Sequence, residues 1–120
     1  MTVLLMALAG GAGATARFVL DGLIRRRWDG GYPWATLVIN VSGSLLLGLL
    51  TGLVLYRGAS LDLRLVLGTG FCGGYTTFST ASFEAVRLQQ RESGLRAMSY
   101  VALTVAGTLA AAALGLLAVR

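Results

Sequence analysis

The stretch Gly68-Thr-Gly-Phe-Cys-Gly-Gly-Tyr-Thr-Thr-Phe-Ser-Thr80 lies in the middle of an apolar segment and decides how the chain folds. Glycine and threonine are poor helix formers, so the helix that this segment would build is predicted to break within the run from Gly73 to Thr80. In lipid, irregular backbone is tolerated only where protein or a water-filled cavity satisfies its amides and carbonyls. A break therefore indicates an ion or substrate site. The alternative is a continuous glycine-rich helix packed tightly on a neighbour.

The broken segment is the third of four apolar segments, which cover about residues 2–20, 35–56, 65–86 and 98–119. Each is long enough to cross a hydrocarbon core of ~30 Å. The 120 residues are 56% hydrophobic and 12% charged, which is more apolar surface than so small a soluble domain could bury. We therefore predict an all-α integral membrane protein, a single domain over residues 1–120 with four transmembrane helices in a lipid bilayer. With four crossings, both chain ends lie on one side.

The charged residues favour membrane anchoring over nucleic-acid binding, despite a net charge of +5. All ten basic residues are arginines, and most lie at the ends of the apolar segments or in the loops. Six flank the first and third loops (Arg25, Arg26, Arg27, Arg87, Arg91 and Arg96), against three on the other side (Arg57, Arg64 and Arg120). The positive-inside tendency thus weakly places the first and third loops in the cytoplasm. We expect no nucleic-acid partner.

Glycines at helical spacing predict close contacts between the helices. Small residues three or four positions apart let helix backbones approach one another in lipid. The sets are Gly10, Gly11 and Gly13 in the first segment, Gly48 and Gly52 in the second, and Gly70 and Gly74 in the third. The lone Cys72 has no disulfide partner within the chain and, with no histidine present, no transition-metal site is indicated. We expect Cys72 to be a small buried packing residue.

Two stripes of polar side chains recur at intervals of four residues. The second segment carries Thr36, Asn40 and Ser44, and the fourth carries Tyr100, Thr104 and Thr108. Residues four apart share one helix face, so each stripe could line a path and donate hydrogen bonds to an anion. Hydrogen bonding between helices is the other interpretation of each residue.

Aromatic and ionisable residues inside the segments leave further alternatives open. A phenylalanine ring carries positive charge at its edge and could face an anion, although packing against lipid or core is the commoner role of Phe71, Phe78 and Phe83. Arg17 could concentrate anions at a pore mouth or extend to the headgroups. Glu84 could pair with an arginine, bind a proton or lie in the interface.

Three motifs together resemble the Fluc, or CrcB, fluoride channel family. They are Gly10-Gly11-Ala-Gly13 with Arg17, then Pro33-Trp-Ala-Thr36-Leu-Val-Ile-Asn40 with Gly43 and Gly48, and then Gly70-Phe-Cys-Gly-Gly-Tyr-Thr-Thr-Phe-Ser-Thr80. The resemblance covers all four segments. It implies a passive, fluoride-selective channel that protects a prokaryotic cell, as a multi-pass protein of the plasma (inner) membrane.

The same resemblance implies an antiparallel dimer, formed by two copies or with a paralogous subunit of opposite topology. A structural sodium ion (Na⁺) would lie at the broken helices, held by the backbone carbonyls of Gly73 and Thr76. Arg17 would be the vestibule residue and Glu84 the acid of the third helix. The implied anion pathway, including the hydroxyls beside the ring, comprises Asn40, Thr77, Phe78, Ser79, Tyr100, Thr104 and Thr108.

The family pattern places a second pore phenylalanine three residues after the first. This chain departs from the pattern, because it has Ala81 at that position. Phe83 is no substitute by default, because two positions at ~100° each place it about 200° away around the helix.

Two other functions remain as alternatives. A small proton-coupled multidrug transporter would need a carboxylate deep in the first helix, but the first acidic residue is Asp21. A structural membrane subunit would use its glycines for packing alone. An enzyme is the least favoured class, because no nucleophile and base pair and no set of metal ligands is evident.

Overall fold

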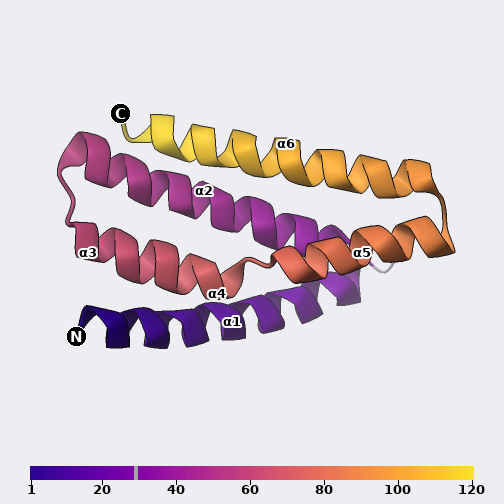
Figure 1. The fold of residues 1–120 in the computed structure, drawn as a ribbon, viewed down its shortest axis with the longest axis horizontal. Helices are drawn as coiled ribbons and strands as arrows, with labels where there is room; N and C mark the ends of the chain where they lie inside the picture. The colour runs from indigo at the N-terminus through magenta and orange to yellow at the C-terminus, as the bar shows by residue number, and fades with distance from the viewer. Residues whose placement is uncertain (29) are drawn as a thin grey trace.

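The computed structural model describes residues 1–28 and 30–120. They form helices that are joined by short turns and lie side by side (Figure 1). The longest dimension of the molecule is 47 Å. Within this part of the chain, three helices are long and apolar enough to cross a membrane: α1 (Thr2–Arg27), α2 (Trp34–Arg57) and α6 (Gly94–Ala118). Both chain ends lie at the same end of the molecule (Figure 1). The all-helical fold is thus as predicted.

The third predicted segment, residues 65–86, is divided among the π-helix η1 (Arg64–Cys72), α4 (Gly73–Tyr75) and α5 (Phe78–Arg91), and the short helix α3 (Leu61–Leu63) precedes it. Helical geometry is lost at Thr76 (φ −82°, ψ 160°) and Thr77 (φ −148°, ψ 121°), which are both extended. The predicted break is confirmed, and the alternative of a continuous helix is wrong. The π-helical winding of η1 was not predicted, although such geometry often occurs at functional sites.

Two helices extend beyond the ends of the apolar segments. α1 continues to Arg27 instead of ending with the apolar residues at position 20, and α5 continues to Arg91. Asp21 and Arg25 form an ion pair one helical turn apart, and three arginines lie in the last turn of α1, where the helix dipole favours positive charge. These interactions stabilise helix beyond the residues that lipid alone would require.

Glycines produce the predicted close contacts. α1 packs on η1 and α4, and α2 packs on α6. A Cβ added at Gly74 would overlap the carbonyl oxygen of Gly10, and one added at Gly48 would overlap that of Ala112. Gly11 differs from its neighbours because a Cβ there would meet nothing within 4 Å. The glycine sets are therefore confirmed as packing residues, with Gly11 as the exception, and Cys72 is buried as expected.

Candidate functional site

The side chain of Asn40 stabilises the break in the third segment. Its Nδ2 donates to the carbonyl of Thr77 at 2.9 Å, and its Oδ1 accepts from the Thr77 amide at 2.8 Å. Asn40 is a buried residue of α2. Its side chain thereby satisfies the amide and the carbonyl of Thr77, which is extended and has no helical partners for them. The conformation of the third segment is thus tied directly to the second helix.

The break removes the usual helical donors from the four carbonyls of residues 73–76, and two of these carbonyls belong to Gly73 and Thr76. In an α-helix the Gly73 carbonyl would accept from the Thr77 amide, which instead donates to Asn40. The Thr76 carbonyl would accept from the Thr80 amide, which donates at 3.2 Å to the Thr77 hydroxyl that caps α5. Carbonyl oxygens are suitable ligands for a hard cation. Gly73 and Thr76 therefore fit the sodium-ligand roles expected from the sequence.

Arg17 lies beside the break. Its Nε donates to the carbonyl of Gly74 at 3.3 Å, so the guanidinium binds the backbone just before the extended residues. Arg17 also lines a pocket of about 170 Å³ together with Asp21, Thr36 and Thr77. This hydrogen bond holds the Arg17 side chain against α4.

A larger groove of about 620 Å³ runs along the other side of the break, between α2, the third segment and α6. The ring of Phe78 lines this groove and is 87% exposed. Ala81 follows one turn later on the same side, so the groove has no second ring where the family pattern places one. Phe83 is absent from the lining, in agreement with its expected direction. The lining also includes Asn40, Gly73, Thr76, Thr77, Thr104 and Thr108.

Three buried hydroxyls lie between α2 and α6 without a hydrogen-bond partner among the described residues: Thr36, Tyr100 and Thr104. Thr36 and Tyr100 are each only 1% exposed. A buried hydroxyl needs a hydrogen-bond partner, and the hydroxyls of Thr36 and Thr104 are the polar neighbours of the Tyr100 hydroxyl. Thr108 differs because its hydroxyl donates at 2.6 Å to the carbonyl of Thr104.

Ser79 and Tyr100 are expected pathway residues that line neither the groove nor the smaller pocket. Ser79 is exposed and has its hydroxyl 3.4 Å from that of Thr77, whereas Tyr100 is buried.

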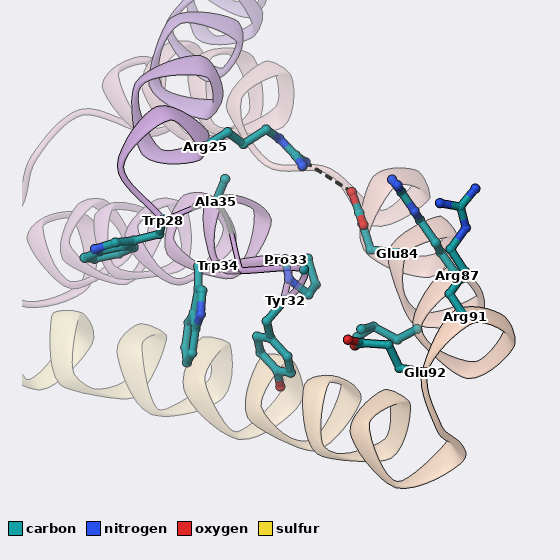
Figure 2. Close-up of a pocket in the computed structure, with 12 residues that line it drawn as sticks. Arg25, Trp28, Tyr32, Pro33, Trp34, Ala35, Glu84, Arg87, Arg91 and Glu92 are labelled. Atoms are coloured by element: carbon teal, nitrogen blue, oxygen red, sulfur yellow. Dashed lines mark hydrogen bonds and ion pairs between the residues drawn. The ribbon is translucent and has the colours of Figure 1, made fainter.

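Glu84 is buried and pairs with an arginine, which was one of the three roles left open. Arg25 reaches across from α1 and donates from Nη2 to Glu84 Oε1 at 3.1 Å, as the dashed line in Figure 2 shows. Sequence reasoning missed Arg25, because in the sequence it is one of three consecutive arginines at a helix end. The pair lies in the wall of a pocket of about 280 Å³ that Trp28, Arg87 and Arg91 also line.

Comparison with known proteins gives the family. The model of the family described as "CrcB-like protein, Camphor Resistance (CrcB)" matches residues 4–116. The chain belongs to the CrcB family.

Relatives within the CrcB family are similar over nearly the whole chain. The protein named Fluoride-specific ion channel FluC 1 of Leifsonia xyli subsp. xyli is 52% identical, covering 89% of this chain and 82% of its own length. Fluoride-specific ion channel FluC 2 of Cutibacterium acnes is also 52% identical and covers 92% of each chain. The FluC 2 of Rhodococcus jostii is 47% identical over 96% of each. The resemblance noted from the three motifs is thus confirmed.

Proposed function

We propose that this chain forms a passive fluoride channel that lets the ion leave a prokaryotic cell through its plasma membrane. Membership of the CrcB family and the names of the relatives support this proposal. Neutral HF crosses lipid, ionises in the less acidic cytoplasm and is trapped there as the anion, so the cell needs a pore for exit. A negative-inside potential favours anion efflux by about 2.3 kcal/mol per 100 mV, so no coupled energy source is required.

The groove side of the break carries the groups that suit fluoride. The carboxamide of Asn40 has two N–H donors, of which one binds the Thr77 carbonyl. The second has no partner in the described part of the chain, while Asn40 lines the groove. The edge of the Phe78 ring and the hydroxyl of Thr104, which also line the groove, offer further contacts that carry no fixed charge. Tyr100 is proposed to join them from its buried position on α6. Such donors can replace the hydration shell of a small anion.

A structural sodium ion between the broken helices of two subunits is the second part of the proposal. The free carbonyls of Gly73 and Thr76 supply two oxygen ligands from each chain, and both residues line the open groove. When bound, the cation would neutralise the dipoles of four carbonyls. We expect detergent-solubilised protein to show a higher melting temperature in sodium chloride than in potassium chloride or N-methylglucamine chloride. Equal melting temperatures in all three salts would contradict this assignment.

An antiparallel dimer is the third part of the proposal. Phe78 is too exposed for a ring that borders a closed path, so a second subunit is proposed to cover it. The arginines flanking the loops are split six to three, a mild bias that a homodimer inserting in both directions would have to overcome. A paralogous subunit of opposite topology would not face this bias. Protease cleavage of a tagged terminus from both sides of the membrane identifies the homodimer, whereas cleavage from one side alone indicates the paralogous partner.

Fluoride conduction is tested directly in proteoliposomes loaded with equal concentrations of potassium fluoride and potassium chloride. With valinomycin to balance charge, we expect fluoride to leave rapidly and chloride to be retained, as followed by ion-selective electrodes. Protein-free liposomes are the control. Equal efflux of both ions, or no fluoride efflux from vesicles shown to contain the protein, would contradict the proposed function.

A further inference from the structure

The ion pair between Arg25 and Glu84 joins α1 to α5 at the end of the molecule that carries the first and third loops (Figure 2). Only 11% of the Glu84 side chain is exposed, against 45% of that of Arg25. Asp21 binds the Arg25 Nε through both carboxylate oxygens, at 3.0 and 2.9 Å, which leaves Nη2 directed at Glu84. The guanidinium is therefore held in place from one side and neutralises a buried carboxylate on the other.

Glu84 lies one helical turn before Leu88, which belongs to the same buried cluster as Tyr100. Ala85, next to Glu84, also packs against this cluster, which Leu37 and Ala97 complete. A carboxylate at position 84 would repel an anion that approaches the Tyr100 hydroxyl.

The surroundings of the pair are otherwise suited to anions. Three arginines and two glutamates line the pocket in Figure 2, and the second glutamate, Glu92, pairs with Arg96 at 2.9 Å. Arg87 and Arg91 have no carboxylate partner within residues 1–28 and 30–120. The pocket thus carries excess positive charge that attracts anions, while a Glu84 carboxylate left without Arg25 would oppose them.

We infer that Arg25 is a positioning residue for fluoride conduction, which orients Glu84 and cancels its charge so that the anion can pass between the arginine-lined pocket and the Tyr100 hydroxyl. This inference rests on the proposed function. It assigns to α1 a role at the end of the path, separate from that of Arg17 at the break.

The test compares initial fluoride efflux from proteoliposomes containing wild-type protein, Arg25→Gln, Arg25→Lys and the double variant Arg25→Gln/Glu84→Gln. We expect Arg25→Gln to slow efflux roughly tenfold, the factor that about 1.4 kcal/mol of added barrier gives. Arg25→Lys keeps the charge and is expected to retain at least half of the wild-type rate. The double variant removes both charges and is expected to return to within about threefold of wild type. Arg26→Gln, at an exposed neighbour outside the ion pairs, is the matched control.

Wild-type rates from Arg25→Gln would overturn the inference, and so would a double variant as slow as Arg25→Gln, because the ion pair would then serve packing alone. If Arg25→Gln does not fold, slow efflux from both Arg25→Lys and the double variant overturns it in the same way. Failure of the wild-type protein to conduct fluoride would instead contradict the proposed function, so the two failures are distinguishable.

Discussion

Replacing Gly74 with alanine is expected to destabilise the protein more than any other single methyl group added to the third segment. The new Cβ would overlap the backbone carbonyl of Gly10 and lie 3.1 Å from the amide nitrogen of Ala14. Neither atom belongs to a flexible side chain, so relief requires α1 and α4 to move apart. We expect a cost of about 3 kcal/mol, the upper end of the usual range for overpacking, which exceeds the ~1 kcal/mol that alanine gains over glycine in a helix.

The measurement is thermal unfolding in detergent, followed through the fluorescence of Trp28 and Trp34. Gly74→Ala is expected to lower the melting temperature by roughly 10 °C or to prevent accumulation in the membrane. Gly11→Ala is the matched control, because it adds the same methyl group to α1 where nothing lies within 4 Å. It should melt at or slightly above the wild-type temperature. Equal melting temperatures for the two variants would show that the contact between α1 and α4 is looser than described.

The sequence was sufficient to predict the helices and the break, because both follow from strong local signals. Long apolar segments have few alternatives to helix in lipid, and four glycines beside threonines in mid-segment weaken a helix at a definite place. The break occurs at Thr76 and Thr77, inside the run that was predicted. The absence of a second ring at Ala81 was anticipated only through the resemblance to the family, and the spacing alone did not single out Phe78 among the phenylalanines.

Contacts between distant residues could not be predicted in the same way. Asn40 and Thr77 are 37 positions apart, and the spacing of polar residues on α2 does not indicate that one of them binds both backbone groups of another segment. Arg25 and Glu84 are 59 positions apart. Arg25 is helical only because α1 extends beyond its apolar residues. These pairings depend on how the helices pack, so they required the structure.

Asn40 is the residue that is proposed to keep the break in its extended conformation beside the fluoride path. Alanine at this position would leave the amide and carbonyl of Thr77 without partners in a part-buried site. It would also remove the free N–H donor that the groove presents. Leaving a buried backbone group unsatisfied costs about 1–3 kcal/mol, so losing both bonds is expected to lower fluoride efflux roughly a hundredfold.

The most direct test is therefore the initial rate of fluoride efflux from proteoliposomes containing Asn40→Ala, set against wild type and Thr15→Ala. Thr15 makes only an exposed bond to the Gly11 carbonyl within α1, so its variant controls for losing a polar side chain in a span. With equal amounts of folded protein confirmed by size-exclusion chromatography, Asn40→Ala should lose nearly all efflux while Thr15→Ala stays within twofold of wild type. Wild-type efflux from folded Asn40→Ala would contradict the claim that this side chain and the break it holds border the fluoride path.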